Sequence, residues 1–284
     1  AQKIDQIAQI RNWFRPKEDS KTYPQIQAYL SGTLDLSTTV SKITTPIDHS
    51  LTTATHPDDL ESTWLDLWTS ILHSSRRTPS AHHSLTTLIS ALKQHPDPRT
   101  NTLSSSAWPK LPFLTPAVRE AYNDAPTDDY DPSFSPDEAP ETVAPIIALE
   151  ATAWANLNTL LASLTAAKIR DFATYYAIWA MRAALEIDHG TAFFKYDARV
   201  PAAAAWVFEA GGELVGREVD LSPKDPREGN PARGGELWKG VAGFGKERWA
   251  FWKERFGVVA GLEGVREETR EVARKAVVEM ERVE

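Results

Sequence analysis

The sequence predicts an all-α fold, an irregular multi-helix bundle built from helical hairpins. Apolar residues recur every three or four positions over most of the 284 residues, which is the period of an amphipathic helix. Two pairs of these segments are separated by only two or three residues, which is typical of antiparallel helical hairpins. No alternating segments flank a convincing β-hairpin turn. We therefore expect a single helical domain over residues 1–284.

Three helices are expected before residue 96. The first covers residues 4–14, where large apolar side chains recur at helical spacing. The second opens at Pro57-Asp58-Asp59-Leu60 and closes at Arg76 and Arg77, with acidic residues in its first turn and arginines in its last turn, as the helix dipole favours. The third starts at Pro79, close enough to the second to make the two antiparallel neighbours. Their supporting apolar positions are Ile4, Ile7, Ile10, Trp13, Phe14, Leu60, Trp64, Leu67, Trp68, Ile71, Leu85, Leu88, Ile89 and Leu92.

Residues 96–145 are expected to form a long acidic, proline-rich loop or insertion within the domain. They contain ten of the nineteen prolines, which remove backbone donors and bias each preceding residue away from helix. Only a short helix at 115–122 is expected inside this segment. The segment has nine acidic and three basic residues, a net charge of −6, against −8 for the whole chain. Since the rest is nearly neutral and has no basic stripe, we expect neither nucleic acid nor an anionic membrane surface as a partner.

The second half of the chain is expected to contain further helices and one irregular region. A hairpin is formed by helices at about 146–164 and 168–188. Residues 211–245 contain nine of the fourteen glycines and should have little regular structure. Within them, residues 214–221 could form a short extended piece, for which no partner is obvious. The remaining expected helices are at 202–209, 246–256 and 262–282.

Several functional motifs are incomplete or absent. Residues 240–246 have the glycine and lysine spacing of a phosphate-binding loop, but Glu247 follows where such a loop has serine or threonine, so we interpret them as a glycine-rich turn. The aspartates of residues 123–131 resemble the Mg²⁺ motif of helical terpene cyclases, but Pro126 excludes an ordinary helix there, which favours a solvated loop. The seven histidines have no metal-ligand spacing and the chain has no cysteine, so we expect no metal site and no cofactor.

The candidate binding residues lie on two helices. On the 168–189 helix, Tyr175, Trp179, Arg182 and Glu186 share one broad sector that mixes aromatic and ionisable groups. Such a mixture can line a ligand pocket. It can equally be an Arg182–Glu186 pair at i, i+4 beneath a tryptophan-rich core. The candidates on the 246–256 helix are Arg248 and Trp252, which stand four residues apart.

One local signature supports a family resemblance. The run Leu237-Trp238-Lys239-Gly240 is followed by Phe244 and then by an aromatic and arginine-rich helix, residues 246–256. Weaker similarities lie at Trp64, at residues 154–158 and around Trp206 after Pro201. In these features the chain resembles an ascomycete fungal family, domain of unknown function 3632, over most of residues 57–256. The resemblance implies an all-helical, intracellular fungal protein and transfers no catalytic residue.

Two hypotheses of function follow. The first is a non-catalytic helical interaction or adaptor protein that holds a protein partner through aromatic and arginine residues. The alternative is a small-molecule-binding protein or enzyme of fungal secondary metabolism, with a pocket between the 168–189 and 246–256 helices. The motifs favour a non-enzyme, and they identify no catalytic residue. The lack of cysteine, of a signal peptide and of any run of about 18 apolar residues predicts an intracellular, cytoplasmic protein without a membrane span.

Overall fold

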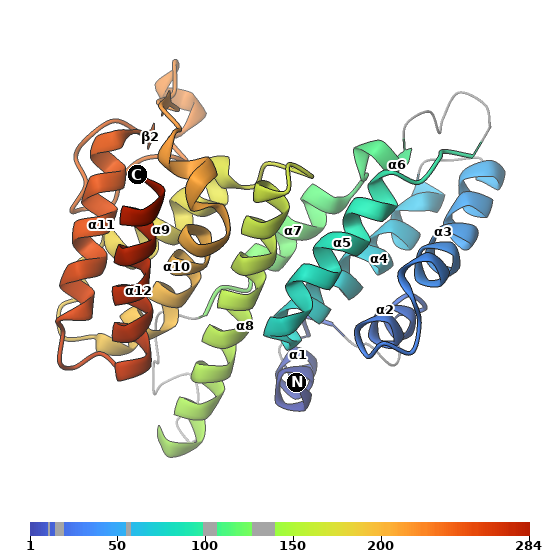
Figure 1. Cartoon of the computed structure of the whole chain (residues 1–284), viewed down its shortest axis with the longest axis horizontal. Coiled ribbons are helices and arrows are strands. Elements are labelled where there is room, and N and C mark those ends of the chain that lie inside the picture. The colour runs from blue at the N-terminus through green and yellow to red at the C-terminus, as the bar shows by residue number, and fades with distance from the viewer. Residues whose placement is uncertain (11, 15–19, 55–57, 99–106, 127–139) are drawn as a thin grey trace. The chain divides into compact units, whose positions relative to one another are not determined.

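A computed structural model describes residues 1–10, 12–14, 20–54, 58–98, 107–126 and 140–284 (Figure 1). The chain divides into two compact units, Ala1–Ala125 and Pro126–Glu284. Almost all regular structure is helical, apart from one antiparallel pair of two-residue strands, so the predicted all-α class is confirmed. In the described part of the chain we find no helix with both the length and the hydrophobicity of a membrane span. That residues 1–284 form one domain stays a prediction.

In the described residues of unit 1, all regular structure is helical. The helix α4 begins at Asp58, one residue after the predicted start, and ends at Arg77 as predicted, and α5 follows after a short 3-10 turn at Pro79–Ala81. Three tryptophans are fully buried: Trp64 stacks on Trp68 with ring centroids 6.1 Å apart, and Trp108 meets Trp64 edge-on at 4.8 Å. These rings form the centre of the unit's core. Its helices are α1 (Gln2–Ile10), α2 (Tyr23–Leu30), α3 (Leu36–Thr53), α4 (Asp58–Arg77), α5 (His82–Lys93), α6 (Ala107–Lys110) and α7 (Leu114–Tyr122).

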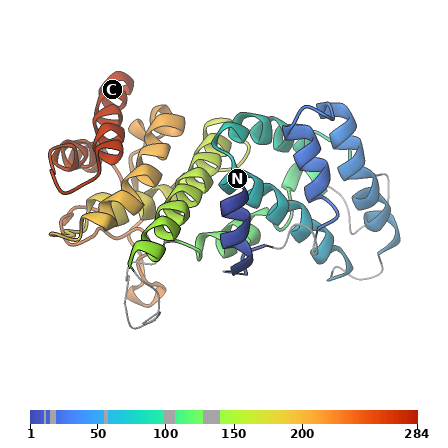
Figure 2. The ribbon, with the colours of Figure 1, turned by 90° about the horizontal axis from the view of Figure 1, so that it is seen from below.

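Unit 2 is built around the long helices α8 and α10. The helix α10 packs along both α8 and α12, and α12 also packs against α11, an arrangement that can be followed in Figures 1 and 2. Between α8 and α10 the buried indole N–H of Trp206 donates to Oδ1 of Asn158 at 2.9 Å, which satisfies both buried groups. Its elements are α8 (Pro140–Ala166), a π-helical turn (Ala173–Ala177), α9 (Ile178–Leu185), α10 (Phe193–Val215), β1 (Val219–Asp220), a 3-10 turn (Pro226–Glu228), β2 (Gly243–Phe244), α11 (Lys246–Ala260) and α12 (Glu267–Val283).

Several predicted helix boundaries were wrong. The helix expected at 168–188 starts only at the π-helical turn, because Lys168 has a left-handed φ of 55° and the Asp171 carboxylate accepts from the Ala173 N–H at 2.8 Å. Conversely, α10 extends far beyond 202–209 and passes through Gly211, which is buried against side chains of neighbouring helices. Leu262 and Val265 precede α12, which begins at Glu267.

The predicted acidic loop contains more helix than expected. In its described part, α6 and α7 form, and α8 already begins at Pro140, six residues before the predicted start at Ile146. Proline is well accepted in the first turn of a helix, since its missing N–H has no intrahelical partner there. The stretches 99–106 and 127–139 of the predicted loop lie outside the described residues.

The extended piece expected at 214–221 is only partly confirmed, because Leu214 and Val215 belong to α10, but its later part does have a partner. Val219 and Asp220 pair with Phe244 and Gly243 in an antiparallel register. Gly243 permits this pairing because its φ is +124° and any Cβ would lie only 2.0 Å from the carbonyl oxygen of Val219. Partners 23 and 25 residues away were not visible in the sequence, since each strand is two residues long.

Candidate functional site

Residues 229–242, here called the strap, lie over the C-terminal end of α9. The backbone N–H of Leu237 donates to the carbonyl oxygen of Glu186 at 2.9 Å. The N–H of Gly235 donates to Oε2 of the Glu186 side chain at 2.8 Å. In return, the Glu236 carboxylate accepts from the N–H of Asp188 at 2.6 Å. The strap has almost no regular secondary structure, but these bonds hold it against the last residues of α9.

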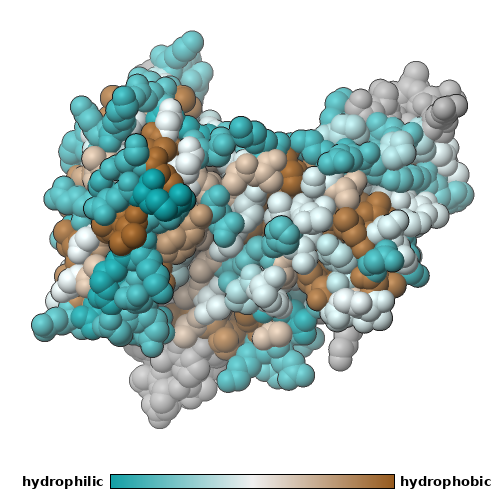
Figure 3. All heavy atoms as spheres, viewed as in Figure 1, coloured by the Kyte–Doolittle hydropathy of each residue, from teal (hydrophilic) through white to brown (hydrophobic). Residues whose placement is uncertain are grey.

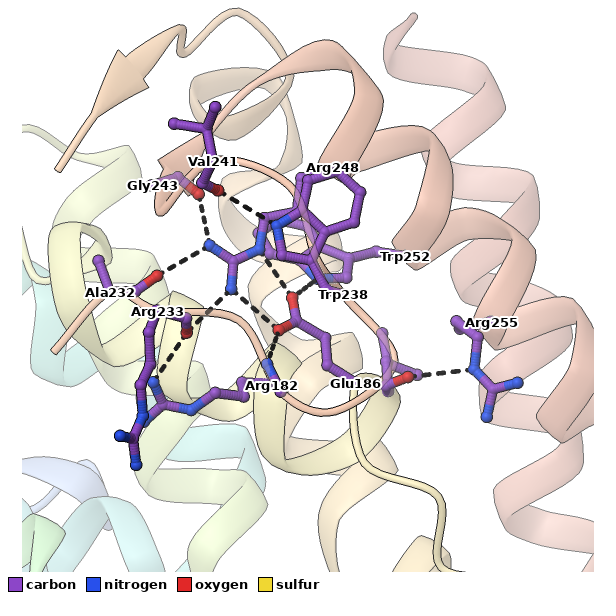
Figure 4. A network of polar contacts seen from close by, with 12 residues as sticks. Arg182, Glu186, Ala232, Arg233, Trp238, Val241, Gly243, Arg248, Trp252 and Arg255 are labelled. Carbon is purple, nitrogen blue, oxygen red and sulfur yellow. Dashed lines mark hydrogen bonds and ion pairs between the residues drawn. The ribbon is translucent and has the colours of Figure 1, made fainter. Parts of the chain in front are cut away.

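A buried ion pair lies beneath the strap (Figure 4). Glu186 is 0% exposed at the end of α9, and Arg248 is 1% exposed in the first turn of α11. Nε and Nη2 of Arg248 donate to the two oxygens of Glu186 at 2.7 and 2.9 Å, which is the bidentate geometry of a strong pair. Trp252, one turn further along α11, donates its indole N–H to Oε1 at 2.6 Å. Three residues predicted as candidates therefore meet directly.

The guanidinium of Arg248 also binds the backbone around it. Its Nη1 donates to the carbonyl oxygens of Ala232 at 3.0 Å and Gly243 at 2.8 Å. It lies over the ring of Trp252, 5.3 Å from the centroid, a distance that permits a cation–π interaction. Both oxygens of Glu186 and three nitrogens of Arg248 are thus used within the protein. We interpret this pair as the structural link between α9, the strap and α11.

The other three predicted residues lie at the edge of this network. Arg182 donates to the carbonyl oxygens of Pro231 and Arg233 at 3.0 and 2.9 Å, and Trp179 donates its indole N–H to Pro231 at 2.8 Å. Tyr175 stacks on Trp179 with ring centroids 5.9 Å apart and is 41% exposed. Arg182 and Trp179 therefore hold the strap through its backbone carbonyl groups. Tyr175 lies next to Trp179 at the surface.

An open groove of about 470 Å³ lies between β1, the strap and the start of α11. We call it the strap groove. Val241 and Val219 are 59% and 45% exposed, and Trp238 is half-buried. In Figure 4 the side chain of Val241 is turned away from the buried ion pair. The groove is lined by Glu218, Val219, Asp220, Trp238, Val241, Phe244, Gly245, Lys246, Glu247 and Arg248.

The glycine-rich turn at 240–246 forms one wall of the strap groove. As predicted, it leads into a helix at Lys246, and the ammonium group of Lys246 pairs with Glu218 at 3.1 Å. The indole N–H of Trp238 donates to the carbonyl oxygen of Val241 at 3.1 Å and closes the turn. Trp238 belongs to the Leu237-Trp238-Lys239-Gly240 signature but was not among the predicted binding residues. The cluster of glycines around it was the signal that a backbone passes closely over other atoms here.

Two glycine substitutions test how closely the strap approaches α9. A Cβ added at Gly235 would lie 2.3 Å from the carbonyl oxygen of Glu186, whereas one added at Gly212 in α10 meets nothing within 4 Å. We expect Gly235→Ala to lower the melting temperature, because the strap must move off the ion pair. We expect Gly212→Ala to raise stability slightly, by up to about 1 kcal/mol, since alanine is the better helix residue. Thermal denaturation of both variants checks this, and equal shifts would contradict the close approach.

Apolar residues on the face drawn in Figure 3 are dispersed. On the face drawn in Figure 3, patches of apolar residues are separated by polar ones. Isolated exposed apolar residues are ordinary on a protein surface, so a binding surface needs further support. Among the described residues, no group of three or more histidines and carboxylates is placed to hold a metal ion. The strap groove combines exposed apolar residues with defined charges.

Comparison with known proteins identifies one family. The model of a family described as "Protein of unknown function (DUF3632)" matches residues 68–256. This range includes α9, the strap and most of α11. No curated protein and no solved structure matches the chain.

Proposed function

The chain belongs to the DUF3632 family, and we propose that it is a non-catalytic helical adaptor that binds a protein partner in the strap groove. The observation that supports this most directly is that Val219 of β1 and Val241 of the strap are exposed in the groove, while hydrogen bonds hold the strap backbone in place. A rigid, exposed apolar surface loses little conformational entropy when a partner binds. The intracellular location and fungal origin implied by the resemblance stay predictions.

The charges around the groove indicate the chemistry of the partner. Glu218, Asp220 and Glu247 are exposed carboxylates, and Lys246 is the exposed cation among the lining residues. Hydrogen bonds from Ser222 lower the pKa of the Asp220 carboxyl, so it is ionised at neutral pH. Because Arg248 is paired with Glu186, the exposed lining charges sum to −2. We propose a partner segment that places an apolar side chain in the groove and a lysine or arginine at its acidic rim.

The alternative function has less support. It requires a pocket between the 168–189 and 246–256 helices, but the side chains named for that pocket bond to one another and to the strap. A small-molecule-binding protein or enzyme of secondary metabolism therefore stays a prediction.

Selection of binding peptides tests the adaptor proposal. A random peptide library is selected on the wild-type protein, and the peptides that emerge are measured by fluorescence anisotropy. We expect sequences that combine a large apolar residue with a basic one, and weaker binding at high salt. Val241→Asp should weaken their binding about tenfold or more, because it puts a charge where the apolar side chain is buried.

The matched control is Val278→Asp. Val278 is 64% exposed on α12 and does not line the strap groove. This variant should bind the selected peptides as tightly as the wild type does. Peptides that bind Val241→Asp with unchanged affinity, or a selection that yields acidic peptides, would contradict the proposal.

A further inference from the structure

Ser222 lies in an exposed, irregular segment beside the strap groove. This segment follows β1 and continues to the 3-10 turn at Pro226–Glu228. The side chain and the backbone N–H of Ser222 both hydrogen-bond to Asp220, and the N–H donates to Oδ1 at 2.8 Å. Because Asp220 lines the strap groove, a group attached to the Ser222 hydroxyl would stand next to the acidic rim of that groove.

The local chain around Ser222 suits modification by a protein kinase. A kinase must bring the target hydroxyl into line with the γ-phosphate of ATP, so the side chain has to be exposed on a segment that can enter another protein's cleft. Ser222 is exposed, and residues 221–225 belong to no helix or strand. Pro223 follows directly, and the ring of a proline biases the preceding residue toward an extended conformation.

The other described residues of this kind are threonines in or beside helices. Thr45 lies within α3, where its hydroxyl already donates to a backbone carbonyl oxygen one turn earlier at 2.7 Å. Thr115 lies within α7, and Thr78 directly precedes a 3-10 turn. Helical segments must open locally before they can extend into an enzyme cleft. Among the described serines and threonines that precede proline, Ser222 is therefore the one presented outside helical structure.

A phosphate on Ser222 would change the charge at the strap groove. The exposed charges that line the groove sum to −2, and a phosphoserine adds about −1.5 to −2 at neutral pH. Lys224, two residues further on, is exposed and carries a single positive charge, so it offsets only part of the phosphate. The rim would become more acidic, which strengthens its attraction for a lysine or arginine of a partner.

We propose that Ser222 is the target of a proline-directed protein kinase and that its phosphate tightens partner binding in the strap groove. The effect on binding rests on the proposed function, whereas the modification does not. In the reaction, Oγ of Ser222 bonds to the γ-phosphorus of ATP while the bond from that phosphorus to the bridging oxygen breaks and ADP leaves. The hydroxyl proton passes to the catalytic aspartate of the kinase.

The test of the site is a kinase reaction on the full, folded chain. The protein is incubated with ATP, Mg²⁺ and a purified mitogen-activated protein kinase, and peptide mass spectrometry follows phosphate at each residue over time. We expect Ser222 to react about tenfold faster or more than Thr45 and Thr115, which helices protect. Pro223→Ala should slow the reaction at Ser222 about tenfold or more, because this class of kinase requires the proline. Pro231→Ala, which removes an exposed proline of the strap, should leave the rate unchanged.

Peptide binding measures the effect of the phosphate. Kinase-treated wild type and kinase-treated Ser222→Ala are titrated with a basic peptide selected on the wild-type protein. We expect the phosphorylated wild type to bind about 2- to 5-fold more tightly, with a gain that shrinks at high salt and disappears after phosphatase treatment. Treated Ser222→Ala should bind like the untreated protein, which excludes an effect of any other modified residue.

Two results would overturn the proposal. One is a reaction at Ser222 that is no faster than at Thr45 and Thr115, or that is equally fast in Pro223→Ala. The other is complete phosphorylation of Ser222 with unchanged peptide affinity. A selection that yields no binding peptide would contradict the adaptor function, and with it the effect on binding. The kinase reaction needs no partner, so it would still decide whether Ser222 is the target.

Discussion

Replacing Glu186 with glutamine is expected to lower the free energy of unfolding by about 3–5 kcal/mol. Glutamine fills the same volume but removes the charge that compensates the buried guanidinium of Arg248. It also replaces an oxygen that now accepts hydrogen bonds with an NH₂ group, which has no acceptor role. Urea denaturation followed by circular dichroism measures the change.

An exposed ion pair near the same helix provides the control. Lys246 and Glu218 pair at 3.1 Å with side chains that are 84% and 62% exposed. Glu218→Gln should change the free energy of unfolding by less than about 1 kcal/mol, since water screens this pair. If Glu186→Gln and Glu218→Gln had equal effects, the buried pair would not be the link that we describe.

Trp252→Ala is the second substitution with a large expected effect. Trp252 is 1% exposed, its ring meets Phe244 edge-on at a centroid distance of 6.2 Å, and its N–H is bound to Glu186. Truncation leaves a cavity and removes one of the two hydrogen bonds to Oε1 of Glu186, so we expect a loss of about 3–5 kcal/mol. Thermal and chemical denaturation measure this loss. Unchanged stability combined with lost peptide binding would instead place Trp252 in an interface.

Trp252→Phe separates the contribution of the ring's packing from the contribution of its N–H hydrogen bond. Phenylalanine retains most of the aromatic packing but cannot donate to Oε1 of Glu186. A loss of about 1–3 kcal/mol is expected for the missing donor. Because Trp252 and Glu186 belong to one network, the effect of the double variant Trp252→Phe, Glu186→Gln should be smaller than the sum of the single effects.

Helices with a strong apolar period could be predicted from the sequence. The helix α4 was predicted to within one residue of its start and to its last residue because acids, apolar residues and arginines all agree there. The helix α3 was missed, since it is rich in serine and threonine and contains Pro46. Its side-chain hydroxyls bond to carbonyl oxygens four residues earlier, as Thr45 does to Ser41, and its few apolar residues, such as Ile43, are buried by tertiary contacts.

Which residues form the candidate site could be predicted better than which of them bond to one another. Residues of the two helices do come together, but the spacing suggested Arg182 as the partner of Glu186, whereas the ion pair joins Glu186 to Arg248. A pair at i, i+4 is visible in a sequence because helix geometry fixes it. A pair between residues 62 positions apart depends on the path of the strap, which no local pattern encodes. The strap groove was missed for the same reason.

The distance along the chain between Glu186 and Arg248 also determines when unit 2 can complete its folding during synthesis. Glu186 leaves the ribosome 62 residues before the arginine that neutralises it. Until then, burying its carboxylate would cost several kcal/mol, so the end of α9 has to stay hydrated while the strap is being made. Helices α8 to α10 can collapse early, but the final closure waits for α11. Unit 2 is therefore expected to reach its native state only after α11 has left the ribosome.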